Sequence, residues 1–252
     1  MRTTLTIARR ELAAFLLAPI AYIALVFFYV AFGLIFYLIS QFGNFAASME
    51  GPFFFVSLFL VLVIPLLTMR QIAEERRMGT MEGVMTAPVT NLSFVVGKFL
   101  GALGFYLILL VPSAVYSWFL FHYSTAGPDP WKLAAGYLGL VLMGVFMLSL
   151  GLLFSSVTRS QVVAALIGII TLFLFWLLGQ AIPQTAPAPL TNTRWEQALR
   201  GLHQAGKFIA FKDHFDPFIK GIVALSDIIF FLSFTVFFLF LAVSVVASRK
   251  WR

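Results

Sequence analysis

The sequence predicts an all-α integral membrane protein with six transmembrane helices per protomer. Hydrophobic residues make up 61% of the 252-residue chain and charged residues only 11%, which leaves too little charge to cover a water-facing surface. Six apolar blocks each have about twenty residues, the length that crosses a hydrocarbon core of roughly 30 Å as a helix. The blocks are apolar on every face, whereas strands of a membrane barrel are shorter and alternate in polarity.

The six blocks are expected to form one transmembrane domain over residues 1–252. In chain order they lie at about 18–40, 52–69, 97–121, 132–154, 161–182 and 225–247. One side of this arrangement collects Arg2, Arg9, Arg10, Arg70, Arg76, Arg77, Lys98, Arg159, Arg249, Lys250 and Arg252, while the short loops of the other side hold only Lys132. The positive-inside rule therefore places both termini and loop 70–96 in the cytoplasm of a multi-pass protein.

The N-terminal residues 3–17 have an amphipathic pattern. Their apolar face carries Leu5, Ala8, Leu12, Phe15 and Leu16, and the opposite face carries Arg2, Thr6, Arg9 and Arg10. This pattern predicts an interfacial helix on the inner leaflet, although a frayed extension of the first span is the alternative. The first apolar block is too long for a signal peptide and has no A-x-A exit, so we expect it to stay as an anchor.

Two of the spans carry glycines at helix-packing spacings. The third has Gly97, Gly101 and Gly104, and the fourth has Gly136, Gly139, Gly144 and Gly151. Small residues at such spacings let two helices approach closely. We expect packing within the chain in preference to a dimer seam.

The densest cluster of charge in the first half of the chain is the segment Arg70–Lys98. Four charged residues stand together there, Glu74, Glu75, Arg76 and Arg77, and Gly79 follows them. Thr80 can cap the N-terminus of a helix, Glu82 would face the positive end of its dipole, and Pro88 would end it. The loop is therefore expected to contain a short cytoplasmic helix over 81–86.

The external loop 183–224 opens with a Pro-rich stretch and then shows two short amphipathic patterns. Apolar residues recur at Trp195, Leu199, Leu202 and Ile209, and again at Phe211, Phe215, Phe218 and Ile222. We expect two short helices at the outer leaflet. Asp216 with Pro217 is the predicted start of the second helix, and Ser226 with Asp227 that of the last span.

The sequence lacks the residues that disulfides, thiolate metal sites, enzyme active sites and nucleotide-binding loops require. Cysteine is absent, which excludes disulfides and thiolate metal sites. The three histidines, His122, His203 and His214, fall in predicted loops, and no H-E-x-x-H motif or mid-span acid is present. No P-loop precedes Lys98. The sequence therefore favours neither an enzyme nor an ion-coupled carrier, and its +7 charge follows from topology, with no nucleic-acid partner expected.

Four separate segments resemble one known family, the type-2 ABC exporter permeases, especially the branch of the gliding-motility permease GldF and the copper-maturation permease NosY. The segments are RRELAAFLLAPIAYIAL (9–25), AEERRMGTMEGVMTAPVTNLSFVVGK (73–98), GLLFSSVTRSQVVAA (151–165) and HFDPFIKGIVALSDIIFF (214–231). The chain departs from the family at Gly83 and Val84, where a leucine is usual, and at Lys220, where an arginine is usual.

The resemblance implies a half-transporter of the bacterial inner membrane, coupled to a separate ABC ATPase in two copies. A second permease subunit, in a homodimer or a heterodimer, would complete the transporter. ATP and Mg would bind to the ATPase, and no cofactor is expected on this chain. The implied ATPase-coupling residues are Glu74, Glu75, Arg76, Arg77, Gly79, Thr80, Glu82 and Pro88. The implied external gate comprises Phe215, Phe218, Gly221 and Asp227.

Simpler roles stand beside these implied ones. Asp227 can be a helix N-cap or a surface partner of Lys220, and the external phenylalanines can be lipid-interface anchors. For the whole chain, the alternative function is a mechanotransmitting or assembly subunit that relays ATPase motion to a subunit with a periplasmic domain. An uncoupled structural membrane protein is a third hypothesis.

Overall fold

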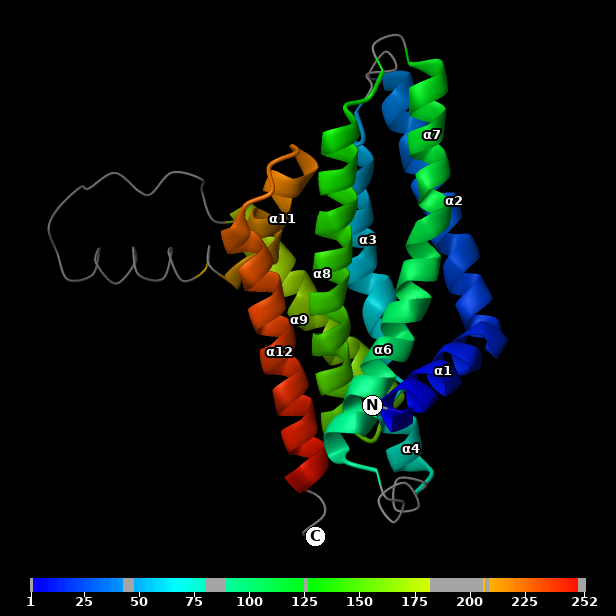
Figure 1. The fold of residues 1–252 in the computed structure, drawn as a ribbon, viewed down its shortest axis with the longest axis vertical. Helices are drawn as coiled ribbons and strands as arrows, with labels where there is room; N and C mark the ends of the chain where they lie inside the picture. The colour runs from blue at the N-terminus through cyan, green and yellow to red at the C-terminus, as the bar shows by residue number, and fades with distance from the viewer. Residues whose placement is uncertain are drawn as a thin grey trace, which may run out of the picture.

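The computed structural model describes residues 2–42, 48–79, 89–124, 127–181, 206 and 209–248. Over these residues the chain is a bundle of helices (Figure 1). In order they are α1 (Arg2–Leu17), α2 (Pro19–Phe42), α3 (Glu50–Thr68), α4 (Ala73–Arg77), α6 (Asn91–Leu110), the 3-10 turn η1 (Val111–Ser113), α7 (Ala114–Tyr123), α8 (Pro130–Val157), α9 (Gln161–Ala181), α11 (Phe211–Ile219) and α12 (Leu225–Ala247).

Six helical segments in this part of the chain are long and apolar enough to cross a membrane. They begin at or near the predicted spans, so the all-α membrane fold with six spans is confirmed. Figure 1 shows α1, α4 and the last turns of α12 at one end of the bundle. We call this end the α4 end; α7, α11 and the first turns of α8 lie in the opposite half.

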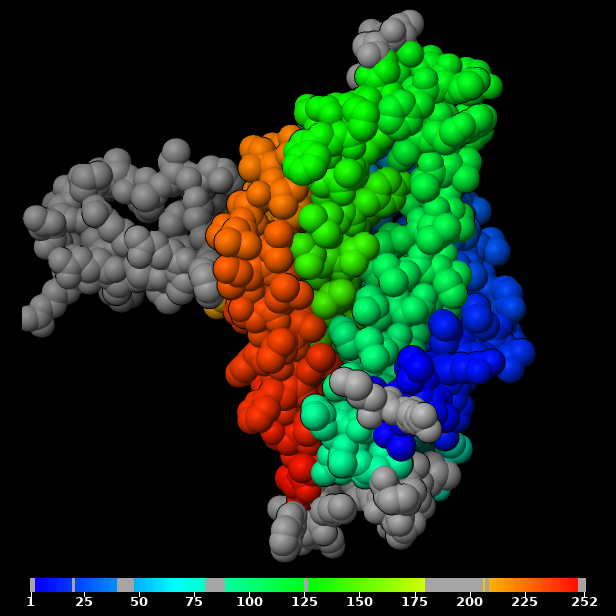
Figure 2. All heavy atoms as spheres, viewed as in Figure 1, coloured from blue at the N-terminus to red at the C-terminus, as the bar shows by residue number. Residues whose placement is uncertain are grey.

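Helix α8 is the centre of the bundle and packs against α3, α6, α9, α11 and α12. Figure 2 shows α12 running along its side. Its glycines are the contact points: a Cβ on Gly136 would overlap the Phe53 ring of α3, and a Cβ on Gly144 would overlap the Tyr106 ring of α6. These glycines therefore pack helices within the chain, as predicted.

The N-terminal helix α1 forms as predicted and crosses α6 obliquely (Figure 1). The glycine stripe of α6 receives it: a Cβ on Gly101 would lie 2.6 Å from Cβ of Glu11 and 3.0 Å from the carbonyl oxygen of Ala8. Phe15 is buried against the ring of Phe105 at a centroid distance of 5.3 Å. Leu5, which the periodicity places on the same face, is 69% exposed.

The third span is longer than predicted and is interrupted. It begins at Asn91, where Oγ1 of Thr90 accepts a hydrogen bond from the Ser93 amide (3.1 Å), and reaches Tyr123 through the 3-10 turn at Pro112. Because proline has no N–H, the turn leaves carbonyls without helical partners. The carbonyl four residues before Pro112 is that of Ile108. The hydroxyl of Tyr29 in α2 lies 3.4 Å from it and 2.9 Å from the neighbouring Leu109 carbonyl, to which it donates.

Three placements differ from the sequence-based expectation. Helix α11 begins at Phe211, so Asp216 and Pro217 do not start it; Pro217 sits in its last turn, where one lost hydrogen bond is tolerated. Helix α12 begins at Leu225 after the N-cap residue Ala224, whose side chain cannot cap it. His122 and His214 lie in helices α7 and α11, and neither lies in a loop.

Candidate functional site

The α4 end holds a network that joins four helices through polar side chains. Its first part fixes α4 to the end of α8. Ser155 Oγ accepts from the backbone amides of Ile72 (3.0 Å) and Ala73 (3.1 Å), and it donates to the Met69 carbonyl at 3.0 Å. These amides stand at the start of α4, where no helical carbonyl is available to them. A guanidinium N–H of Arg76 also donates to the Ser156 carbonyl.

Replacing Ser155 with alanine is expected to lower the free energy of unfolding by about 1–3 kcal/mol, because two buried amides lose their acceptor. The measurement is an SDS titration of the purified protein in mixed micelles. Ser156→Ala is the matched control, since Ser156 Oγ bonds only the Leu153 carbonyl of its own helix and is equally buried. Equal losses in the two variants would contradict the assigned role of Ser155.

The second part of the network is a buried ammonium group. Lys98 of α6 has a side chain only 2% exposed, and its Nζ lies 2.8 Å from Glu11 Oε1 of α1 and 2.8 Å from Glu75 Oε1 of α4. Gln71 donates through Nε2 to the Lys98 carbonyl at 3.3 Å. The Lys98 ammonium group thus ties α6 to α1 and α4, and the Lys98 carbonyl ties α6 to the turn that leads into α4.

Arg10 completes the charge balance of this cluster. Its guanidinium lies 3.5 Å from Glu11 and 3.7 Å from Glu75 and is 63% exposed, so two cations face two carboxylates. Water screens the contacts of Arg10, which contribute little. The contacts of Lys98 are shielded from water, and removing one partner of such a buried group is costly.

A recess of about 200 Å³ opens beside this cluster, between α1 and α4. Charged and polar side chains form one part of its wall, and Ala14, Phe15 and Met78 form the apolar part. The charged and polar lining residues are Glu11, Arg70, Gln71, Glu74, Glu75 and Lys98. The recess therefore lies at the junction of the N-terminal helix with the charged segment.

In the opposite half, helix α11 turns its phenylalanines inward. Phe211, Phe215 and Phe218 are fully buried, and a Cβ on Gly139 of α8 would lie 2.6 Å from Cβ of Phe218. They cannot face lipid, so the alternative that these phenylalanines anchor α11 at the lipid interface is wrong. Their inward direction follows from the strongly one-sided distribution of apolar residues in α11, which matches the small residues of α8.

Asp227 also has a specific place. Its Oδ1 lies 2.8 Å from Nδ1 of His214, whose ring stacks on Phe230 at a centroid distance of 3.8 Å. Neither a helix cap nor a pair with Lys220 is present, so both simpler readings of Asp227 are corrected. Gly221 has a positive φ of 83° and its carbonyl accepts from the Trp131 indole at 2.9 Å, which fixes the end of α11 to the start of α8.

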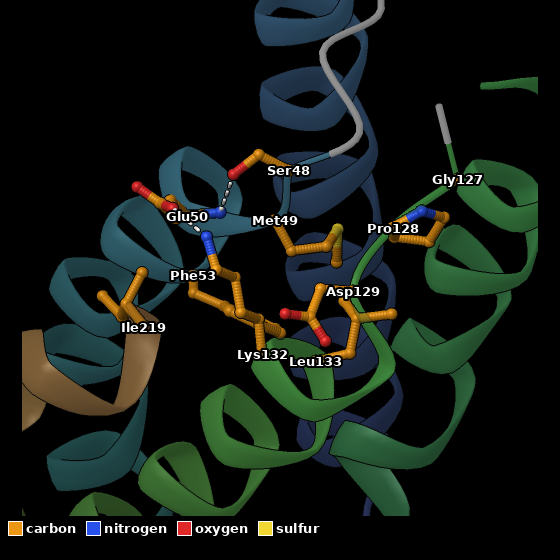
Figure 3. Close-up of a pocket in the computed structure, with 10 residues that line it drawn as sticks. All are labelled: Ser48, Met49, Glu50, Phe53, Gly127, Pro128, Asp129, Lys132, Leu133 and Ile219. Carbon is orange, nitrogen blue, oxygen red and sulfur yellow. Dashed lines mark hydrogen bonds and ion pairs between the residues drawn. The ribbon is translucent and has the colours of Figure 1, made fainter. Parts of the chain in front are cut away.

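A second recess, of about 240 Å³, lies in this half between α3, α8 and Ile219 of α11 (Figure 3). Figure 3 shows Lys132 reaching toward Glu50 at its edge, with 3.8 Å between their charged atoms. Both side chains are about half exposed, so the pair contributes little. The α4 end, with its buried charge, is the stronger candidate for a functional site.

A comparison with family models decides the family. The model of the ABC-2 family transporter proteins matches residues 5–249, nearly the whole chain. The chain belongs to the ABC-2 transporter family. A search of curated proteins finds none that matches it. As an ABC-2 protein, the chain is a permease subunit of an ABC transporter, and an ABC ATPase is its partner.

The ABC-2 permease brings together some of the predicted coupling residues. Glu75 and Arg76 turn inward to Lys98 and to Ser156, whereas Arg77 is exposed. Glu74 is half-buried and lines the recess, and Gly79 takes a φ of 71°, which favours glycine. Thr80, Glu82 and Pro88, with the predicted helix 81–86, lie outside the described residues, as does the first external helix near Trp195.

Sequence reasoning missed four residues of the α4 end, namely Glu11, Gln71, Lys98 and Ser155. Lys98 offered a signal: it stands in an apolar run, VVGKFLGA, where a charged residue needs a partner. Glu11 stands one residue after two arginines and reads as a surface charge. Gln71 and Ser155 gave no signal, because their partners are backbone groups of helices distant in sequence.

Proposed function

We propose that this chain is the permease subunit of a bacterial inner-membrane ABC exporter and that its α4 end faces the cytoplasm and the ATPase. The family match and the distribution of basic residues support this orientation, since the basic residues gather at the end that holds α1 and α4. The observation that carries the proposal is the buried Lys98, which joins α1, α4 and α6.

The proposed coupling runs from the charged segment into the membrane. ATPase closure displaces the loop after α4, and α4 moves with it. Because Lys98 binds Glu75 of α4 and Glu11 of α1, the three helices respond as one body. Because Ser155 of α8 accepts hydrogen bonds from the amides at the start of α4, α8 moves with α4 as well. Rigid-body movement of packed helices between two arrangements is an established way to alternate access.

The finer assignments rest on the quoted resemblance. They are export, two ATPase copies, a permease pair, and membership of the gliding-motility and copper-maturation branch. We assign Phe215, Phe218, Gly221 and Asp227 to the external gate; their contacts with α8, His214 and Trp131 make this region one packed unit. A gate built in this way opens by moving α11 and the start of α12 together.

Affinity purification of the tagged protein in mild detergent, with mass spectrometry of the bound proteins, tests the proposal. We expect a stoichiometric ATPase with Walker motifs. A further subunit with a large periplasmic domain would favour mechanotransmission over export. Absence of any ATPase, from protein that is folded and monodisperse, would overturn the proposal.

Glu82→Lys is expected to abolish ATPase stimulation by the permease while expression and membrane insertion stay normal, because it reverses a charge in the proposed docking segment. The measurement is ATP hydrolysis by the reconstituted complex. Glu50→Lys, the same change on the opposite half, is the control and should retain stimulation. Full stimulation in Glu82→Lys would remove Glu82 from the coupling site.

A further inference from the structure

We propose that the recess between α1 and α4 receives a basic side chain, an arginine or lysine, of the ABC ATPase subunit. The inference rests on the proposed function, because it takes the α4 end as the face to which the ATPase binds. The recess has a volume of about 200 Å³ and all its lining residues belong to the described part of the chain.

An unpaired acceptor stands in the wall of this recess. Gln71 is only 4% exposed, and its amide nitrogen is engaged with the Lys98 carbonyl at 3.3 Å. This bond fixes the orientation of the amide, since only the nitrogen can donate. Its oxygen Oε1 is buried and has no hydrogen-bond donor among the described residues. A buried acceptor of this kind is normally paired, so a donor from outside is expected.

A carboxylate without a cation lies next to it. Glu74, one helical turn before Met78, lines the same recess and makes no side-chain hydrogen bond or ion pair within the described residues. Glu11 and Glu75 differ, because both are bound to Lys98. Arg70 also lines the recess and makes no ion pair with Glu74. Lys98 and Arg10 pair with Glu11 and Glu75, which leaves Glu74 as the lining carboxylate that no cation of the described residues binds, so a donor that enters beside it should be positively charged.

The shape of the lining favours a long basic side chain. Ala14, Phe15 and Met78, which is 61% exposed, provide an apolar wall for a methylene stem, while Glu74 and Gln71 accept from the charged head. The nine residues that follow Gly79 in the sequence, TMEGVMTAP, include no Lys, Arg or His. The loop next to α4 therefore cannot supply the cation. We assign it to the ATPase, which binds this face in the proposed function.

Photo-cross-linking in the complete complex tests the contact directly. A benzophenone amino acid replaces Met78 at the edge of the recess, and native membranes are irradiated before mass spectrometry. We expect a cross-link to an ATPase peptide that contains an arginine or lysine. The same probe at Trp131, exposed in the opposite half, should give none. A cross-link from Met78 only to lipid or to this chain's own termini, with ATPase present, would overturn the inference.

Charge reversal provides the second test. Glu74→Arg is expected to lower the amount of copurified ATPase by about tenfold or more, as removal of a charge partner at an interface does. Glu50→Arg should not change it. Reversing the cross-linked ATPase base to glutamate should restore binding to Glu74→Arg. Unchanged ATPase recovery with Glu74→Arg would overturn this inference and leave the permease function standing, whereas a wild-type protein that recovers no ATPase would overturn both.

Discussion

Replacing Lys98 with methionine should lower the free energy of unfolding by about 3–5 kcal/mol and abolish ATPase-coupled activity. The substitution keeps the length and the apolar stem of the side chain but leaves the mostly buried Glu11 and Glu75 facing each other, with only the exposed Arg10 as a cation nearby. Breaking a buried ion pair by removing one partner has a cost of this size. SDS titration of the purified permease and ATP hydrolysis by the reconstituted complex measure the two effects.

A neutralised triple variant separates stability from coupling. Lys98→Met combined with Glu11→Gln and Glu75→Gln removes all three buried charges. It should recover most of the lost stability, because the one charge left without its partners, Arg10, is exposed to water. Coupling should stay impaired, since α1, α4 and α6 are no longer tied together. Lys132→Met is the control, as its pair with Glu50 is half exposed and should cost less than about 1 kcal/mol. A single Lys98→Met variant as stable as Lys132→Met would contradict the buried site.

Gly144→Ala is expected to destabilise the bundle by about 1–3 kcal/mol or more, the usual range for inserting a methyl group into a packed core. The added carbon would overlap the ring of Tyr106, which is fully buried and donates from its hydroxyl to the Leu140 carbonyl at 2.7 Å. The ring cannot retreat without losing that bond. Thermal unfolding in detergent, followed by the loss of the monodisperse peak, measures the effect.

The second-site change Tyr106→Leu should restore part of the stability of Gly144→Ala, because the shorter side chain makes room for the methyl group. Gly104→Ala is the matched control. A Cβ there would lie 3.4 Å from Leu12, an ordinary contact, and alanine favours a helix over glycine by about 1 kcal/mol. We expect Gly104→Ala to be neutral or stabilising. A tolerated Gly144→Ala would contradict the close contact between α6 and α8.

The fold was predictable because each span is specified by its own residues. Continuous apolar blocks of about twenty residues can only be spanning helices in a bilayer, so six spans followed without tertiary information. The glycines of α6 and α8 were readable for a similar reason, since only their spacing was needed. Helix ends were harder: Asp216 and Pro217 form a good local start signal, yet packing of Phe211 and Phe215 on α8 begins α11 earlier.

The site was predictable only in part, since its key contacts join residues far apart in sequence. Lys98 and Glu11 are separated by 87 positions, and Ile72 and Ser155 by 83. Periodicity marks the face of α1 but not the partner that it packs on. The resemblance implied Glu75 and Arg76 as ATPase-coupling residues but not their direction, and the structure turns both side chains into the protein.

Helices α1 and α2 meet at a corner, so that they form a short arm and a long arm of one unit. Only Ala18 separates the two helices, and it bonds in both directions, to the Phe15 carbonyl at 3.1 Å and from the Ala21 amide at 3.0 Å, so the corner is stiff. At 1.5 Å per residue the arms are about 24 and 36 Å long. The short arm, α1, binds Lys98 through Glu11. The long arm, α2, carries Tyr29, which donates a hydrogen bond to the Leu109 carbonyl beside the break in the third span. A tilt of the short arm at one membrane face is therefore expected to shift the turn at Pro112, which lies at the bundle surface, along a path separate from the one through α4 and α8.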